Sequence, residues 1–393
     1  MVQKPELIAF SHYKVGGVQN FFYNLLRPLV ASGEFDILWI YEDFQDGENT
    51  SLSQTYGVGK EIVYRRVMPE DRTVYDRYKR LSSHISNRPG VAVTNFYPEL
   101  VTLHLHRRSA KTIYFVCHDE QYLQPAKDYE FLIDVFIAHN PQFHKALIAL
   151  LPHRKNEIFY LPYGITIRER KQPKIESETL KIIFAARHVE HKGVYELPEI
   201  IALTEQQCGN VKWTILGDGP LTGFLKEHLG NKSNVRFYNF STNEEVIDEM
   251  AKNDVYILPS YLDGLPVAML EAMSMGCVPV MYKFNEGIAE VLDTSEAFIV
   301  ESGIRQQFAD SIASLYNNRQ LLTAMSTRCV QKVQHDYNIQ TCVNGYKEVF
   351  LRYKELKKPV RRKTILYGGL LELPLIPAFL RKGLRGLKKR IKG

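Results

Sequence analysis

The chain has 393 residues, of which 45% are hydrophobic and 24% charged, an ordinary globular composition with room for two or three domains. Its five cysteines are widely spaced without a Cys-x-x-Cys pair, which argues against a disulfide framework or a zinc site and favours a reducing compartment. The net charge of +6 is uneven: residues 357–393 carry +11, which leaves −5 for residues 1–356 and argues against a nucleic-acid-binding domain.

The first residues lead directly into a predicted strand at 7–10, without the apolar core of a signal peptide. No run of 18 apolar residues occurs, so we expect no segment to span a membrane. A loop ending in Gly16 and Gly17 follows, and then a helix over 18–30 in which Pro28 predicts a kink or an early end. A strand, a glycine turn and a helix in this order open doubly wound α/β domains, with the helix N-terminus at the ligand crevice.

Apolar runs and helical patterns alternate through the rest of the first half. We expect strands at 36–41, 62–67, 91–95, 111–117, 134–138 and 157–161, and helices at 73–85, 98–107 and 139–149. His118 follows one of these strands directly. The carboxyl end of a strand in such a sheet lies at the ligand crevice, so His118 is a candidate functional residue, with a purely structural histidine as the alternative.

Residues 167–178 are polar and lack an apolar period, which indicates an interdomain linker. A strand at 180–186 then leads into Arg187, Lys192 and Gly193. The planar guanidinium can bind two phosphate oxygens, and we expect the compact Lys192 charge to lie beside a helix N-terminus that also favours anions. The alternative is a solvated basic loop. His188 and His191 lack an apparent third metal ligand.

Residues 254–281 read as a buried strand (255–258), a loop, a helix from Pro266 to about residue 275 and a second buried strand (278–281). Gly264 allows the loop backbone to approach a ligand. Asp263 lies in the loop and Glu271 about one and a half turns into the helix. A capping aspartate with a solvated glutamate is the alternative.

Further strands are expected at 211–216, 235–238 and 298–300, and helices at 243–250, 305–316, 321–334 and 340–356.

The sequence from Asp263 to Ala272, DGLPVAMLEA, resembles the E-x7-E signature of the retaining GT-B glycosyltransferases of family 4, with Asp in place of the first Glu. Arg187 with Lys192-Gly193, the Gly217-Asp218-Gly219-Pro220 turn and the Gly16-Gly17 loop resemble other motifs of that family. The resemblance covers roughly residues 5–356. It implies an α/β GT-B fold with two Rossmann-like doubly wound domains facing a central cleft. The implied parts are an acceptor domain (1–166), a linker (167–178), a nucleotide-sugar donor domain (179–339) and a cross-over helix (340–356).

The resemblance also implies roles for individual residues. Arg187 and Lys192 would bind the donor diphosphate, Glu271 the ribose, and Asp263 and His118 the donor sugar. The remaining donor-site positions are Gly16, Gly17, Gly217, Gly264 and Leu265. The implied reaction retains the anomeric configuration by front-face attack, and the departing phosphate accepts the proton of the acceptor.

No D-x-D motif occurs in the chain, so the positive charge at the leaving group is expected from side chains, without a metal or other cofactor. Two other functions are compatible with these residues: a GT-B sugar-nucleotide epimerase or hydrolase, and a non-catalytic GT-B scaffold. Release of free sugar without acceptor would favour the first, and nucleotide binding without turnover would favour the second.

Residues 357–393 form a basic tail. As a helix, its carboxyl-terminal part gathers apolar side chains within an arc of ~140°, namely Ile376, Phe379, Leu380, Leu384, Leu387 and Ile391. This pattern predicts a helix lying on an anionic membrane surface, which suggests a cytoplasmic, peripheral protein with a lipid-linked or glycan acceptor. A helix docked on the protein body is the alternative. RNA binding is disfavoured because the tail has few aromatic residues.

Overall fold

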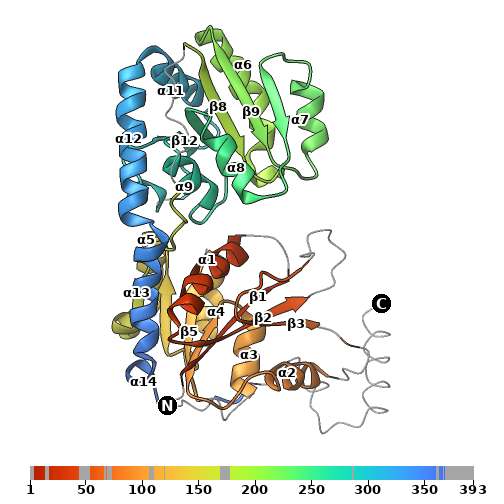
Figure 1. The fold of residues 1–393 in the computed structure, drawn as a ribbon, viewed down its shortest axis with the longest axis vertical. Helices are drawn as coiled ribbons and strands as arrows, with labels where there is room; N and C mark the ends of the chain where they lie inside the picture. Colours follow the sequence, from red (N-terminus) through yellow and green to blue (C-terminus); the bar gives the residue numbers. More distant parts are fainter. Residues whose placement is uncertain are drawn as a thin grey trace. The chain divides into compact units, whose positions relative to one another are not determined.

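The computed structural model describes residues 4–13, 17–43, 54–65, 68, 73–105, 110–118, 120–168, 178–285, 287–359, 363–365 and 367. The chain forms two compact units, each built on a parallel sheet with helices packed against it (Figure 1). The first unit comprises Met1–His139, Phe143–Leu161 and Val343–Gly393, and the second comprises Asn140–Gln142 and Pro162–Cys342. The predicted class, two doubly wound α/β domains, is confirmed by the sheet of each unit.

The first unit contains a seven-stranded sheet in the order β3-β2-β1-β4-β5-β6-β7, with every pair parallel. Its strands are β1 (Glu6–His12), β2 (Asp36–Asp43), β3 (Lys60–Arg65), β4 (Gly90–Thr94), β5 (Lys111–Cys117), β6 (Val135–Ala138) and β7 (Ile158–Tyr160). The order reverses between β1 and β4. Each of these strands overlaps an apolar run that predicted it, because strands buried on both faces have long continuous apolar stretches.

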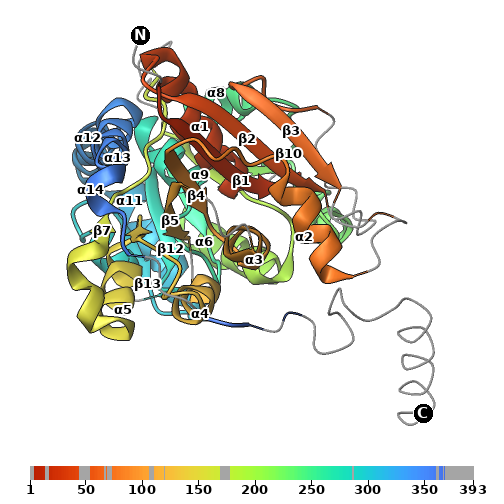
Figure 2. The same ribbon diagram turned by 90° about the horizontal axis from the view of Figure 1, so that it is seen from below.

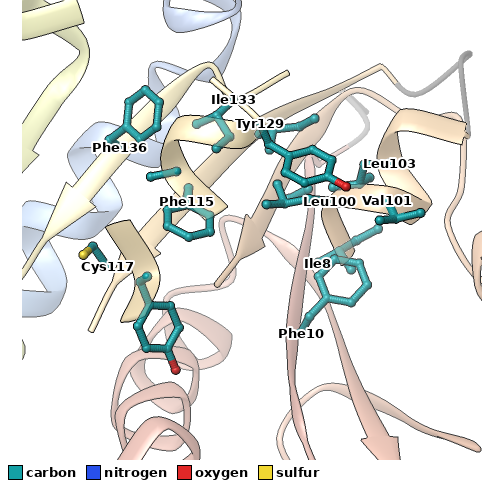
Figure 3. Close-up of a cluster of buried hydrophobic side chains, with 14 of the residues drawn as sticks. Ile8, Phe10, Leu100, Val101, Leu103, Phe115, Cys117, Tyr129, Ile133 and Phe136 are labelled. Carbon is teal, nitrogen blue, oxygen red and sulfur yellow. The ribbon is translucent and has the colours of Figure 1, made fainter. Parts of the chain in front are cut away.

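One face of this sheet is covered by four helices. They are α2 (Val74–Ser82), α3 (Tyr97–Leu105), α4 (Leu123–Asp128) and α5 (Pro141–Leu150). Phe10 and Phe115 from the strands pack in one apolar cluster with Leu100 of α3 and Tyr129 (Figure 3). Burying such side chains contributes about 1.5–3 kcal/mol each, so the sheet and these helices form one core.

The other face is covered by α1 (Gly17–Ser32), and Figure 2 shows α1 and α3 on opposite sides of the strands. Phe22 of α1 packs against Trp39 of β2. The helix continues through Pro28, so the early end that this proline predicted is wrong. Buried Leu25, Leu26 and Leu29 surround that turn and hold it against the sheet.

The last helices return to the first unit. The predicted single helix over 340–356 is broken at Arg352 into α13 (Ile339–Leu351) and α14 (Tyr353–Leu356). The hydroxyl of Tyr114 on β5 donates to the Val349 carbonyl at 2.9 Å, and Thr112 donates to the Tyr353 carbonyl at 2.6 Å. Both helices are therefore fixed to strand β5.

The start of the basic tail also packs on the first unit. Tyr367 is buried in the apolar cluster that also contains residues of α2 and α3. Its hydroxyl lies 2.5 Å from Nδ1 of His104. Nε2 of His104 lies 2.8 Å from the Lys363 carbonyl. The tail is thus attached to the body as far as residue 367. The predicted amphipathic helix lies outside the described residues. Among the residues that are described, no helix is long and apolar enough to cross a membrane.

The second unit contains a six-stranded parallel sheet in the order β10-β9-β8-β11-β12-β13. Its strands are β8 (Leu180–Ala185), β9 (Val211–Leu216), β10 (Val235–Tyr238), β11 (Val255–Leu258), β12 (Val278–Tyr282) and β13 (Phe298–Val300). The helices are α6 (Leu197–Gln207), α7 (Thr222–Leu229), α8 (Asn243–Met250), α9 (Val267–Ser274), α10 (Ile288–Val291), α11 (Arg305–Asn317) and α12 (Arg319–Asp336). The strand order reverses between β8 and β11, which is where ligands bind in sheets of this type.

Candidate functional site

The loops after β8 and β11 carry the cation and the acid that the sequence singled out. The two strands pair in parallel, so their carboxyl ends lie at the same edge, on the two sides of the switch point. Nζ of Lys192 lies 2.5 Å from Oδ2 of Asp263. Both side chains are largely shielded, with 19% and 16% of their surface exposed. The two residues therefore form an ion pair at the position where the fold places a ligand.

The loop that carries Lys192 is not the start of an α-helix. Two 3-10 turns, Glu190–Lys192 and Val194–Glu196, precede α6, which begins only at Leu197. The predicted helix N-terminus beside Lys192 is therefore wrong. Gly193, between the turns, has φ +71°, and a Cβ there would lie 1.8 Å from the Pro259 carbonyl oxygen. Only glycine fits this contact, which holds the cationic loop against the end of β11.

Arg187 lies two residues after the end of β8 and is exposed. Within the described part of the chain its guanidinium makes no ion pair. An unpaired, exposed guanidinium at the carboxyl end of a strand offers two parallel donors to an incoming anion.

The loop that carries Asp263 is fixed through its backbone. Ser260 Oγ and the Tyr261 amide both donate to the His191 carbonyl, at 2.9 and 2.8 Å. Nδ2 of Asn285 donates to the Asp263 carbonyl at 2.9 Å. The hydroxyl of Tyr163 donates to the carbonyl of Leu265, which is buried. The acid loop is thus held from three directions by contacts that leave the Asp263 carboxylate to its pair with Lys192.

Glu271 lies in α9, which begins at Val267 with Pro266 as its N-cap. Nδ2 of Asn243, the first residue of α8, donates to Oε1 of Glu271 at 2.9 Å. Burial raises the pKa of Glu271 to about 7, and the Asn243 hydrogen bond and the charge of Arg168 oppose that rise. Glu271 is therefore poised between its charged and neutral forms near neutral pH, a property common at functional sites.

Gly217 follows β9, the strand on the other side of β8. Its φ is +130°, and a Cβ would lie 2.1 Å from the Ala186 carbonyl oxygen, so this position also requires glycine. In the same turn Thr222 Oγ1 donates to Oδ1 of Asp218 at 2.8 Å and lies 2.8 Å from Nδ1 of His188. Burial lowers the pKa of His188, which keeps the ring neutral. Among the described residues no group of three or more His, Cys, Asp or Glu could hold a metal ion.

A second ion pair supports the acid loop and was not predicted from the sequence. The Arg305 guanidinium donates to both carboxylate oxygens of Glu196, with Nε at 2.5 Å from Oε2. Tyr261 and Tyr282 also bond to this carboxylate. Burial raises the pKa of Glu196, but the hydrogen bonds from Arg305 and the two tyrosines outweigh it, so the pKa is lowered. Glu196 therefore connects the acid loop to α11.

The first unit carries the remaining predicted residues. His118 follows β5 and is buried against Phe21 of α1 and His139, with ring centroids 5.1 and 4.9 Å apart. Burial lowers the pKa of His118 well below its usual value, and its Nε2 has no hydrogen-bond partner among the described residues. Gly17 is the first residue of α1, and Gly16 lies outside the described residues.

The structure thus brings Arg187, Lys192, Gly217, Asp263, Gly264, Leu265 and Glu271 into the second unit, around three neighbouring strand ends. Sequence reasoning missed Tyr163, Glu196, Asn243 and Asn285, which hold these residues in place. The sequence placed Asn243 at the start of a helix, but its hydrogen bond to Glu271 joins two helices and has no local signal.

Comparison with solved structures establishes the fold over most of the chain. The structure of Anabaena HepE in complex with UDP-glucose superposes with a TM-score of 0.68 at 16% sequence identity, and the match covers 87% of this chain and 98% of that one. Likeness at this identity concerns the fold alone. With the two doubly wound units, it defines this protein as a GT-B fold.

The sequence comparisons find similarity to glycosyltransferases in the second unit. Residues 166–336, which hold the site described above, match the model of the family described as glycosyl transferases group 1. The chain is 26% identical to the amylovoran biosynthesis glycosyltransferase AmsK of Erwinia amylovora over 44% of its own length and 45% of that protein. It is 26% identical to the UDP-Gal:alpha-D-GlcNAc-diphosphoundecaprenol alpha-1,3-galactosyltransferase of Escherichia coli over 35% of its length and 36% of that protein. The chain therefore matches less than half the length of these relatives.

Proposed function

We propose that this protein is a glycosyltransferase that moves a sugar from a nucleotide-sugar donor to a glycan acceptor. The observation that supports this most is the set of charges at the switch point of the second sheet. Arg187 and Lys192 follow β8, and Asp263 and Glu271 follow β11, on the two sides of the reversal in strand order. Cations for a diphosphate and acids for hydroxyl groups are what a nucleotide sugar requires.

Each charged group has a distinct task in this proposal. Arg187 and Lys192 offset the charge that develops on the diphosphate as the sugar departs, which is the main catalytic requirement of the reaction. Glu271, oriented by Asn243, accepts hydrogen bonds from the ribose hydroxyls. Asp263 accepts a hydrogen bond from the sugar. Gly217, Gly264 and Leu265 line the donor through their backbone, and His118 of the first unit is assigned to the sugar by the family resemblance alone.

The proposed reaction retains the anomeric configuration. The bond between the anomeric carbon and the phosphate oxygen breaks, and the acceptor oxygen attacks from the same face. The proton of the acceptor passes to the departing phosphate, so no protein nucleophile is needed. We expect no metal requirement because side chains supply the positive charge at the leaving group.

The acceptor is proposed to be a lipid-linked glycan of a cell-surface polysaccharide. Relatives support this in part: one is named for amylovoran biosynthesis and another for a diphosphoundecaprenol acceptor. The +11 charge of residues 357–393 would attract the protein to an anionic membrane from the cytoplasmic side. No nucleic-acid partner is proposed.

The function is tested by incubating the full chain with single sugar nucleotides and extracted bacterial lipid-linked glycans, and by measuring nucleoside diphosphate release. The expected result is release that depends on the acceptor, together with a glycan longer by one sugar. Release of free sugar at the same rate without acceptor would instead identify a hydrolase. Tight nucleotide binding without turnover over the whole panel would identify a scaffold.

A further inference from the structure

We propose that Asp263 is an internal competitor of the donor diphosphate for Lys192, and that this competition makes the site prefer the sugar-bearing nucleotide over the sugar-free product. The inference rests on the proposed function and adds a role for one of its residues. Asp263 would be both the group that the diphosphate displaces and the group that the sugar then satisfies.

The geometry supports competition because Lys192, one of the two cations of the site, already pairs with Asp263. Oδ2 of Asp263 lies 2.5 Å from Nζ of Lys192, and the two side chains are mostly shielded from water. Arg187, the other cation, makes no ion pair within the described part of the chain. A diphosphate can therefore reach Arg187 freely but must take Lys192 from a carboxylate.

The Asp263 side chain can be released without moving its loop. The loop is held by backbone contacts, from Asn285 to the Asp263 carbonyl and from Tyr163 to the Leu265 carbonyl. Neither contact uses the carboxylate. Exchange of partners thus requires only rotation of one aspartate and one lysine side chain, and such rotations in partly exposed residues are fast.

Displacement of Asp263 from Lys192 has different consequences for the nucleotide sugar and for the nucleoside diphosphate. When a nucleotide sugar binds, its phosphates take Lys192 and a sugar hydroxyl donates to the released carboxylate, so every charged group has a partner. When only the nucleoside diphosphate is present, the carboxylate loses Lys192 and gains no hydroxyl. An unpaired, shielded charge beside phosphates is unfavourable. Return of Asp263 to Lys192 would then favour release of the product.

The length of the side chain fits this role. The resembling family signature has Glu at this position, and Asp is one methylene shorter. In this structure the shorter side chain meets Lys192 directly. The residue that departs from the signature is therefore the one that pairs with Lys192.

The test measures pyrophosphate binding by calorimetry at low salt, because inorganic pyrophosphate does not depend on the base or the sugar of the donor. The variants are Asp263→Asn, Lys192→Gln and the double variant, each in the full chain. We expect Asp263→Asn to bind pyrophosphate about tenfold more tightly than the wild type. In the Lys192→Gln background Asp263→Asn should raise the pyrophosphate affinity by less than about threefold, because the lysine that Asp263 pairs with is absent. Asp310→Asn makes the same charge change on exposed α11 and should have no effect.

A second measurement compares UDP with UDP-glucose as probes. We expect Asp263→Asn to shift the ratio of the two affinities toward UDP, and Asp263→Ser to shift it in the same direction, which guards against misfolding of one variant. Unchanged or weaker pyrophosphate binding by Asp263→Asn would overturn the inference, and so would an equal gain in both lysine backgrounds. A wild-type chain that binds neither pyrophosphate nor any nucleoside diphosphate would instead refute the proposed function.

Discussion

The hydroxyl of Tyr163 donates a hydrogen bond to the carbonyl oxygen of Leu265, which lies 102 residues further along the chain. Tyr163 is buried, and Leu265 is two residues after Asp263. This bond fixes the backbone of the acid loop at the point where the loop enters α9. The position of the Asp263 carboxylate therefore depends on a residue that lies outside every charged motif.

Replacing Tyr163 by Phe removes this bond and keeps the aromatic ring. We expect Tyr163→Phe to lower kcat with the nucleotide sugar while the affinity for free nucleoside diphosphate changes less, because the proposed diphosphate ligands lie mainly in the loop after β8. The expected loss of stability is about 1 kcal/mol. Tyr346→Phe is the matched control, since Tyr346 donates a similar bond to the Leu161 carbonyl in the first unit. Equal kinetic effects of both variants would contradict the positioning role.

The raised pKa of Glu271 predicts a pH dependence of nucleotide binding. Below pH 7 the folded protein holds Glu271 mostly neutral, and above it the carboxylate can accept the ribose hydroxyls. The affinity should therefore rise by about tenfold between pH 6 and pH 8. Titration calorimetry of the wild type and Glu271→Gln checks this, because phosphate ionisation contributes equally to both. Identical pH slopes for the two proteins would refute the assignment.

The same shift predicts how stability changes with pH. Between the ordinary value of 4.5 and about 7, the folded state keeps a proton on Glu271 that the unfolded state has lost. The contribution of Glu271 to the free energy of unfolding therefore falls as pH rises through this window. Glu271→Gln should remove that part of the slope in urea unfolding curves measured at several pH values.

Two parts of the tail should have different roles. Residues up to 369 should attach the tail to the first unit, and the residues after 369 should bind the membrane. A chain ending at residue 369 keeps buried Tyr367 and its contact with His104, so we expect a stable fold that no longer sediments with anionic vesicles. A chain ending at Lys357 loses Tyr367 as well and should be less stable by about 3 kcal/mol. Thermal unfolding and vesicle sedimentation of the two truncations test this division. If the chain ending at residue 369 still binds vesicles fully, the membrane site lies elsewhere.

Full-length protein provides the control for the electrostatic part of this binding. Its sedimentation with anionic vesicles should decrease with salt, because the screening length falls from ~10 Å at 0.1 M to ~3 Å at 1 M. Neutral vesicles should bind less at every salt concentration.

Turnover should persist in EDTA. In the proposed site Arg187 and Lys192 would supply the positive charge that a divalent ion otherwise provides, so chelation should leave the rate within about twofold of its untreated value. Acceptor-dependent release of nucleoside diphosphate gives the rate. Complete loss, restored by magnesium or manganese, would show that the reaction depends on a metal.

Much of the fold could be predicted because the buried parallel strands are short apolar runs with clear ends. The strands β9, β10, β11 and β13 begin and end where the sequence placed them. The ends of the helices were harder to predict from the sequence. The helix α1 continues through Pro28 because its apolar side chains pack on the sheet, a tertiary contact that local propensity does not contain.

The charged residues of the site could be predicted, but their arrangement could not. The sequence placed Arg187, Lys192 and Asp263 at strand ends without showing that Lys192 and Asp263 touch. It also placed a helix start beside Lys192, where the structure has 3-10 turns around Gly193. That geometry depends on the Pro259 carbonyl of another strand, which is a long-range contact and leaves no local signal.

The most direct test of the central claim is a thermal-shift screen of the wild-type chain against the nucleoside diphosphates, repeated with Arg187→Ala, Lys192→Ala and the exposed control Lys212→Ala. We expect at least one nucleoside diphosphate to stabilise the wild type, by about 2.7 kcal/mol at 100 times its dissociation constant. Each site variant should lose about 1.5–3 kcal/mol of binding free energy, and Lys212→Ala should bind as the wild type does. Stabilisation of all four proteins to the same extent, or of none, would contradict this prediction.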